Sequence, residues 1–137
     1  MTIFFRLLSG VIKGMTAEEA LKTVSPAFYR AEELINEIHD QWIEWFTYYL
    51  ARLARENETD QERKENMDRV NPKYVLRNYM AQLAIDQADQ GDYALISELY
   101  NLLTDPYGEQ PEQEKWFAKR PEWARHKVGC SMLSCSS

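Results

Sequence analysis

The feature that most constrains the fold of this chain is the recurrence of helix-start signals along it. A Ser or Thr followed three residues later by Glu satisfies free amides at a helix N-terminus, and a capping residue followed by proline suits the first helical turn. Between these signals, apolar residues return every three or four positions, as on the buried face of a helix. No alternating strand pattern competes, so we expect an all-α protein. The signals are Thr16 with Glu19, Ser25 with Pro26, Thr59 with Glu62 and Asn71 with Pro72.

The apolar spacing predicts helices of unequal length. Residues 105–124 contain three prolines and four aromatic residues, so we expect them to pack as short turns against the helices. The fold class is therefore an irregular multi-helix array over residues 1–128, followed by a flexible cysteine-containing tail over residues 129–137. Helices are expected at 3–11, 16–21, 26–53 (one helix or two in series, capped by Ser25), 59–69, 71–91 and 92–106, with stops at Gly10 and Gly14, Asn57, Gly91 and Pro106.

Charge and hydropathy exclude some classes of partner. The net charge is −6, and the basic residues are scattered among acids, which disfavours binding to nucleic acid or to an anionic membrane. The apolar stretch 1–12 is far shorter than the roughly 20 residues of a membrane-spanning helix. It also lacks the basic start and the small-residue cleavage site of a signal peptide. We therefore expect no membrane partner and a cytoplasmic protein.

The residues offer little direct sign of catalysis. The chain has no phosphate-binding glycine loop, no Gly-x-Ser-x-Gly motif and no His-Glu-x-x-His motif. His39 is expected to be a packing residue on the long helix, and His126 to be solvated. Cys130 and Cys135 alone cannot supply the ligands of a structural zinc site. A loop cluster of carboxylates is best explained as solvated, although a divalent cation is conceivable there; it comprises Asp105, Glu109, Glu112 and Glu114.

Two segments could contact a partner. The aromatic stripe 42–49 is most simply a core, but its size would also allow it to cover another protein. The predicted helix from Asn71 carries two cations and two amides beside core positions. Lys73 and Arg77 stand four residues apart and would share a helix face. This pattern suggests polar contacts across an interface, and a solvated face explains it equally; the residues are Lys73, Arg77, Asn78 and Gln82.

The segment that carries the clearest family resemblance is 71–82, which reads Asn-Pro-Lys-Tyr-Val-Leu-Arg-Asn-Tyr-Met-Ala-Gln. It resembles the C-terminal signature of the selenoprotein O family. Segments that agree with it in order are 2–6 (Thr-Ile-Phe-Phe-Arg), 50–53 (Leu-Ala-Arg-Leu), 105–111 (Asp-Pro-Tyr-Gly-Glu-Gln-Pro) and 135–137 (Cys-Ser-Ser). The resemblance spans nearly the whole chain.

The resemblance implies the C-terminal part of a kinase-like fold in a protein adenylyltransferase. Such enzymes transfer AMP from ATP to hydroxyl side chains of proteins, with magnesium or manganese. The family's nucleotide-binding and metal-binding residues lie upstream of the matched region, so none of them is carried over. The implied partners are the kinase-like core, in the same protein or as a split gene product, and the protein substrates of the intact enzyme.

The resemblance also assigns a role to Cys135. In the family, the third residue from the end is cysteine or selenocysteine and is implicated in redox control through a disulfide to the kinase-like core. Cys130 could replace the missing partner, but a bridge between residues five apart closes a small loop and demands favourable geometry.

The sequence therefore predicts a C-terminal helical segment of an adenylyltransferase that is inactive alone. A free-standing helical interaction module is the alternative, and a small thiol redox protein is a third option.

Overall fold

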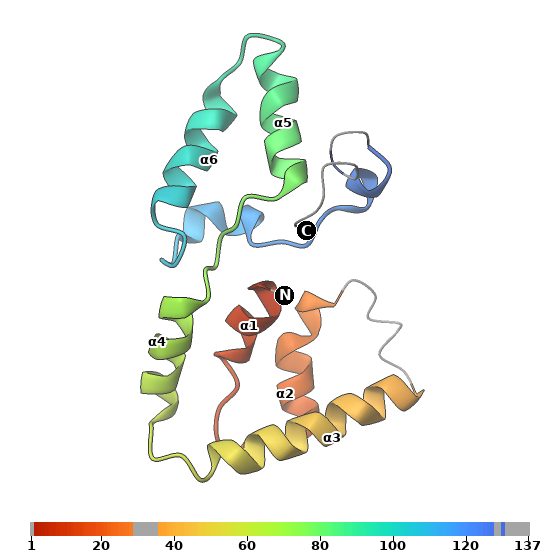
Figure 1. Cartoon of the computed structure of the whole chain (residues 1–137), viewed down its shortest axis with the longest axis vertical. Coiled ribbons are helices and arrows are strands. Elements are labelled where there is room, and N and C mark those ends of the chain that lie inside the picture. The colour runs from red at the N-terminus through yellow and green to blue at the C-terminus, as the bar shows by residue number, and fades with distance from the viewer. Residues whose placement is uncertain (1, 29–35, 128–129, 131–137) are drawn as a thin grey trace. The chain divides into compact units, whose positions relative to one another are not determined.

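The structure is a computed structural model that describes residues 2–28, 36–127 and 130. Every regular element within these residues is a helix, which confirms the all-α prediction. The chain divides into two compact units, Met1–Pro72 and Lys73–Ser137, whose helices are labelled in Figure 1. Each unit has its own hydrophobic core. Among the residues described, no helix combines the length and the apolar character that crossing a bilayer requires.

Among its described residues, the first unit contains four α-helices. They are α1 (Thr2–Leu8), α2 (Ala17–Val24), α3 (Asn36–Leu53) and α4 (Asp60–Val70). The short helices α1 and α2 pack with the long helix α3 around one apolar cluster. Its buried members come from α1, the following loop, α2 and α3, and are Leu8, Val11, Ala20, Leu21, Val24 and Phe46.

Both predicted capping boxes are confirmed. Thr16 starts α2, where its hydroxyl accepts from the Glu19 amide at 3.2 Å and its own amide donates to the Glu19 carboxylate at 2.8 Å. Thr59 and Glu62 make the same pair of bonds at the start of α4. The α-helix start predicted at Ser25 is wrong, because residues 25–27 form a single 3₁₀ turn that follows α2 directly.

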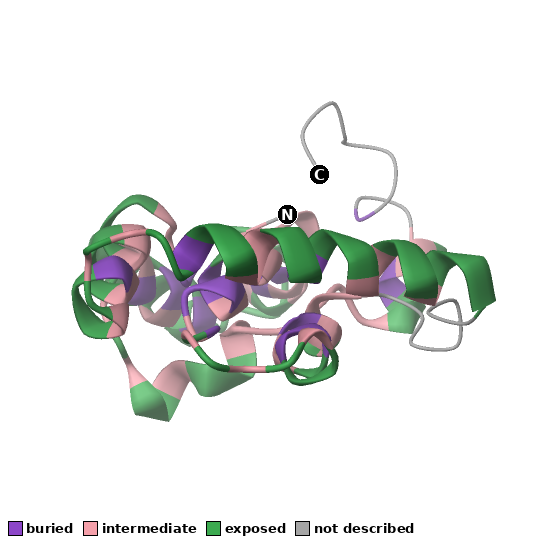
Figure 2. Ribbon diagram, turned by 90° about the horizontal axis from the view of Figure 1, so that it is seen from below, coloured by how far each residue is buried: buried purple, intermediate pink, exposed green. Residues whose placement is uncertain are grey.

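The aromatic stripe on α3 is partly core and partly surface. Phe46 is fully buried, whereas Trp45 is 41% exposed and Tyr48 is 69% exposed. Trp45 stacks on Tyr49 with ring centroids 5.1 Å apart, so the exposed ring still packs along its own helix. Much of the long helix is exposed (Figure 2). The described part of α3 begins at Asn36, and residues 29–35 of the predicted helix lie outside the described residues.

The second unit is built on a pair of helices, α5 (Asn78–Ala88) and α6 (Ala94–Thr104). Gly91 has a φ of +85° in the turn between them, a conformation that favours glycine, so its predicted role as a helix stop is confirmed. The predicted short turns are also present, as 3₁₀ helices at Pro111–Trp116 and Glu122–Arg125. The buried core residues are Tyr74, Tyr79, Met80, Ala84, Leu95, Leu99, Leu102, Ala124 and Cys130.

The helix start predicted at Asn71-Pro72 is wrong. Proline disfavours helical geometry at the residue before it, and Asn71 accordingly has extended dihedrals. Its amide donates back to the Met67 carbonyl at 2.9 Å, so Asn71 ends α4. The next two amides, of Lys73 and Tyr74, donate to the Pro106 carbonyl. The next helix, α5, therefore begins only at Asn78.

Candidate functional site

The four polar residues predicted to lie on one helix are divided between two kinds of backbone. Lys73 lies in the non-helical segment before α5, and Arg77 immediately precedes its first helical residue. Asn78 and Gln82 lie on α5, four residues apart and on one face. Lys73 and Arg77 do not share a helix face, because the helix begins at Asn78 rather than at Asn71.

Lys73 is instead the buried centre of a charge cluster, which we call the Lys73 clamp. Its ammonium nitrogen lies 2.6 Å from a Glu109 carboxylate oxygen and 2.7 Å from a Glu114 carboxylate oxygen. The Lys73 side chain is only 7% exposed, whereas the two carboxylates are 59% and 57% exposed. The same nitrogen lies 5.2 Å from the ring centroid of Phe117 and 5.6 Å from that of Tyr74. Burial lowers the pKa of Lys73, but the bonds to Glu109 and Glu114 raise it by more, so the ammonium stays charged.

Backbone bonds hold the clamp to the loop that follows α6. The amides of Lys73 and Tyr74 both donate to the Pro106 carbonyl, at 2.8 and 3.0 Å. The Tyr74 hydroxyl donates to the Gln110 carbonyl at 3.0 Å. The Gln110 side-chain amide donates back to the Leu102 carbonyl, also at 3.0 Å. The segment before α5 and the loop after α6 are thus tied by both side chains and backbone.

The four acids of the loop are exposed, as expected, but two of them also bind a lysine. Glu109 and Glu114 bind the Lys73 ammonium, and the Asp105 carboxylate accepts from the Gly108 amide at 3.1 Å. The cationic group between the glutamates belongs to the protein itself. Within the part of the chain that the structure describes, no three His, Cys, Asp or Glu residues are grouped so as to hold a metal ion.

Gln82 takes part in a second charge contact of this unit. Its side-chain amide donates to an Asp86 carboxylate oxygen at 2.8 Å, and the other oxygen pairs with the Lys127 ammonium. The Lys127 ammonium also lies 5.7 Å from the Trp123 ring centroid. Lys127 first and Gln82 second lower the pKa of Asp86, because both stabilise its charged form. The contact ties α5 to the segment around residues 122–127.

The structure describes Cys130 but not Cys135. Cys130 is 2% exposed and packs in the core that also contains Tyr74 and Met80, with a free thiol. It is thus a core residue, although the predicted tail includes it. Cys135 lies outside the described residues, so its predicted redox role stays a prediction.

Two buried arginines in the first unit were not singled out from the sequence. Arg63 on α4 is 5% exposed, and its guanidinium donates to the Val11 carbonyl and, at 3.4 Å, to the Ser9 carbonyl. Arg6 on α1 donates to the Asp68 and Asn71 carbonyls at the end of α4, at 2.9 and 3.1 Å. Cations are favoured at a helix C-terminus. The sequence could have indicated a buried role for Arg6, because this arginine lies within the apolar start of the chain. No such indication was present for Arg63 on the charged helix α4.

His39 is at the surface rather than in the core as expected. Its two ring nitrogens lie 3.4 Å from an Asp40 oxygen and 3.3 Å from a Glu18 oxygen, and its side chain is 33% exposed. The hydrogen bond to Asp40 raises the pKa of His39, and the contact with Glu18 adds to this effect. His39 therefore links α3 to α2 through its contact with Glu18. His126 is exposed, as expected.

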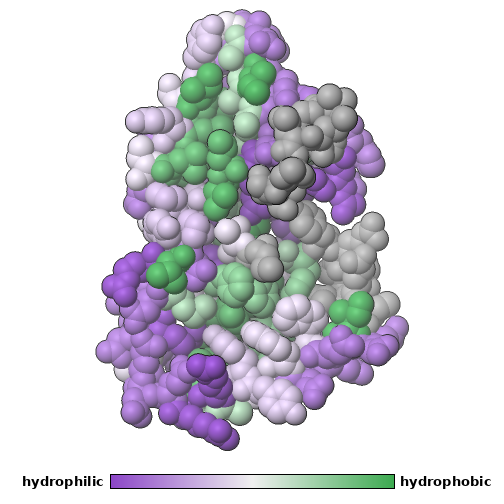
Figure 3. Space-filling view, in the orientation of Figure 1, coloured by the Kyte–Doolittle hydropathy of each residue, from purple (hydrophilic) through white to green (hydrophobic). Residues whose placement is uncertain are grey.

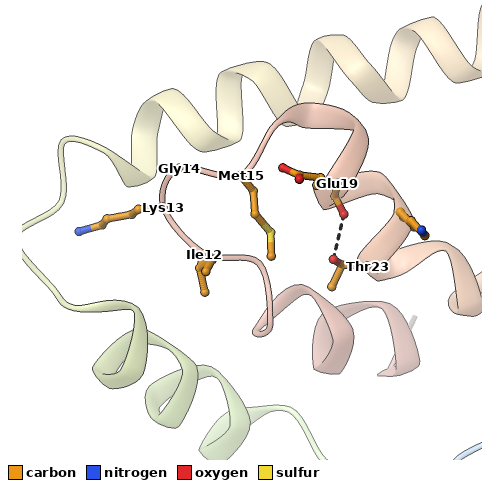
Figure 4. A pocket seen from close by; sticks show the side chains of 7 residues that line it. Ile12, Lys13, Gly14, Met15, Glu19 and Thr23 are labelled. Atoms are coloured by element: carbon orange, nitrogen blue, oxygen red, sulfur yellow. Dashed lines mark hydrogen bonds between the residues drawn. The ribbon is translucent and has the colours of Figure 1, made fainter.

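An open pocket of about 500 Å³ lies beside the loop between α1 and α2 (Figure 4). Its polar groups serve the fold: Glu19 belongs to a capping box, and the Lys13 ammonium donates to the Glu56 and Glu58 carbonyls at 2.7 Å. None of the predicted site residues lines it. The lining residues are Ile12, Lys13, Gly14, Met15, Glu19, Lys22 and Thr23.

Comparison with known families agrees with the resemblance seen in the sequence. The model of the family described as protein adenylyltransferase SelO matches residues 2–104. The chain belongs to this family. Curated SelO-family relatives are named protein nucleotidyltransferase YdiU: the protein from Flavobacterium johnsoniae is 61% identical over 137 residues, and those from Rhodopirellula baltica and Aromatoleum aromaticum are 47% and 45% identical.

These SelO-family relatives are much longer than this chain. The alignments cover 100% of the chain but only 26%, 27% and 25% of the three relatives. The chain therefore spans about a quarter of their length. The match to the family model ends at residue 104, before Glu109 and Glu114, whereas these three relatives align over the whole chain, including the loop that completes the Lys73 clamp.

Proposed function

We propose that this chain is the C-terminal helical part of a protein adenylyltransferase, which in its intact form transfers AMP from ATP to Ser, Thr or Tyr hydroxyls of proteins in the cytoplasm. The observation that carries the proposal is the 61% identity with a protein nucleotidyltransferase over every residue of this chain, which corresponds to 26% of that relative. The resemblance of run 71–82 to the selenoprotein O signature supports the finer assignment to AMP transfer.

In this reaction the acceptor hydroxyl oxygen bonds to the α-phosphorus of ATP and pyrophosphate leaves, while the hydroxyl proton passes to a base. Such a transfer depends on groups that hold the phosphates and stabilise their charge. We assign ATP and Mg²⁺ or Mn²⁺ to the kinase-like core in the remaining three quarters of the enzyme. Lys73 is the most buried lysine described, and its ammonium is already bound by two glutamates, which supports a structural role.

The role of the present segment is then to pack against that core and to carry the terminal thiol. Cys135 is the proposed redox-regulatory residue, because the closing Cys-Ser-Ser resembles the family's terminus. Cys130 remains an alternative disulfide partner for Cys135, but the burial of the Cys130 thiol in the second unit's core disfavours that pairing.

A label-transfer assay tests the proposal. The chain alone, incubated with ATP labelled at the α-phosphorus, Mg²⁺ or Mn²⁺ and a general protein acceptor, is expected to incorporate no label. A chimera in which this chain replaces the matching quarter of the Flavobacterium johnsoniae relative is expected to incorporate it. Transfer by the chain alone, or none by the chimera when the parent relative is active, would contradict the proposal.

The alternative is a free-standing helical interaction module, and the exposed Trp45 and Tyr48 on α3 are the observation that favours it. A module of this kind should be monomeric, melt cooperatively and bind no hydrophobic dye. A segment separated from its core should bind the dye or self-associate. Sedimentation and dye fluorescence of the chain alone therefore distinguish an interaction module from a segment of a larger enzyme.

A further inference from the structure

Helix α6 is apolar beyond the face that it buries. Leu95, Leu99 and Leu102 are 8%, 4% and 1% exposed and pack in the core of the second unit. A helix confined to one apolar face would carry polar residues elsewhere. Instead, α6 has a second apolar face that is exposed to solvent.

The second face consists of Tyr93, which directly precedes α6, with Ile96 and Tyr100. These residues are 62%, 47% and 71% exposed. Their spacing of three and four positions places them on one side of the helix. Leu103, which is partly buried against the core, lies between this side and the buried one. We call Tyr93, Ile96 and Tyr100 the outer face of α6. Hydrophobic surface is visible over the unit that contains α5 and α6 (Figure 3).

The area of the outer face decides what can cover it. An aromatic residue buries about 150–250 Å² when it is fully enclosed, so the exposed parts of these three residues amount to roughly 350 Å². A stable dimer needs about 800 Å² on each partner. A second copy bound through this face alone would have less than half of that area. A segment of the same polypeptide needs less, because its covalent connection removes much of the entropy loss of association.

From these observations we propose that the outer face of α6 packs against the part of the nucleotidyltransferase chain that lies outside this segment. The inference rests on the proposed function, since it requires the longer enzyme. About three quarters of each curated relative has no counterpart in this chain, so an intramolecular partner of sufficient size exists. The match to the family model runs to residue 104 and includes the whole of α6.

Hydroxyl-radical footprinting with mass spectrometry tests the contact without relying on activity. The oxidation rates of Tyr93 and Tyr100 are compared between the chain alone and the chimera with the Flavobacterium johnsoniae relative. We expect at least a fivefold lower rate for both residues in the chimera. Tyr48, which is 69% exposed on α3, is the matched reference. Unchanged rates for Tyr93 and Tyr100, or equal protection of Tyr48, would overturn the proposal.

The same footprinting experiment distinguishes the other partners that could cover the outer face of α6. The rates are compared at concentrations where sedimentation shows a monomeric chain; protection in the chimera that grows with protein concentration would assign the face to a second copy. Protection in the chain alone at every concentration would assign it to another part of this chain. Either result overturns the proposal. An inactive chimera with protected tyrosines would refute the proposed function and leave the contact standing, whereas an active chimera without protection would refute the contact alone.

A pair of variants supplies an independent test. Ile96→Glu places a charge in the outer face, and Ile85→Glu does the same on α5, where Ile85 is 50% exposed. In the chimera, Ile96→Glu is expected to lower label transfer at least tenfold and Ile85→Glu less than twofold. In the chain alone, both variants are expected to change hydrogen exchange of α6 less than twofold. Equal effects of the two variants in the chimera would contradict the assignment.

Discussion

Replacing Lys73 with methionine should destabilise the second unit by about 2 kcal/mol. Methionine keeps most of the aliphatic side chain but removes the charge that bonds to Glu109 and Glu114. Fully buried, each charged hydrogen bond would contribute about 1.5–3 kcal/mol, but both carboxylates are more than half exposed, so about 1 kcal/mol each is appropriate. Loss of the ring contacts adds about 1 kcal/mol, and relief of the buried charge offsets roughly the same amount.

Hydrogen–deuterium exchange resolves this effect by unit. A loss of about 2 kcal/mol corresponds to roughly 30-fold faster exchange of the α5 and α6 amides that open with the unit. Peptides from α3, in the first unit, serve as the internal reference. Lys115→Met is the matched control: Lys115 pairs with Glu98 at 2.6 Å and lies over the Trp116 ring, but it is 58% exposed. We expect less than about 1 kcal/mol for it.

The reasoning fails if Lys73→Met changes exchange of α5 and α6 less than threefold, or no more than Lys115→Met does. A double-mutant cycle identifies the cause. In a Glu109→Gln and Glu114→Gln background, Lys73→Met should have at most half of its original effect, because its charged partners are already removed. An unchanged effect would mean that Lys73 acts through packing and not through charge.

Other regions of the chain give further predictions. The hydrogen bond to Asp40 raises the pKa of His39 above 6.5, so the charged contact stabilises the fold below about pH 6.5 and is lost as pH rises through the higher folded pKa. NMR titration of His39 should give a pKa above 6.5, and His39→Gln should remove this part of the pH dependence of stability. Arg63→Met should destabilise the first unit by about 2–4 kcal/mol, because the Val11 carbonyl loses its donor, and hydrogen exchange of α2 and α3 measures this. Cys130 should react with a thiol reagent at least 100-fold more slowly than a small free thiol, and comparable rates would contradict its burial.

The features predicted correctly from the sequence depend on local bonds. Thr59 and Glu62 are three residues apart, and all of their capping bonds lie within that interval, so the pattern is visible in the sequence. The turn at Gly91 depends on one backbone angle that glycine adopts readily. Such features require no knowledge of the rest of the fold.

The features that were missed depend on residues far apart in the chain. Asn71-Pro72 has the sequence of a helix start, but the carbonyl that takes the next two amides belongs to Pro106, after α6. The Lys73 clamp needs Glu109 and Glu114, which lie 36 and 41 residues further along the chain. Nothing in local spacing distinguishes these glutamates from the other acids of the loop, so their contact with Lys73 was not predicted.

The central claim is that this segment serves an enzyme that transfers AMP to protein hydroxyls. The most direct test incubates the chimera with the Flavobacterium johnsoniae relative and ATP labelled at either the α- or the γ-phosphorus, with mass spectrometry of the acceptor. The account predicts that only the α-label is incorporated and that AMP is found on Ser, Thr or Tyr. Incorporation of the γ-label would show phosphate transfer, and would contradict the account.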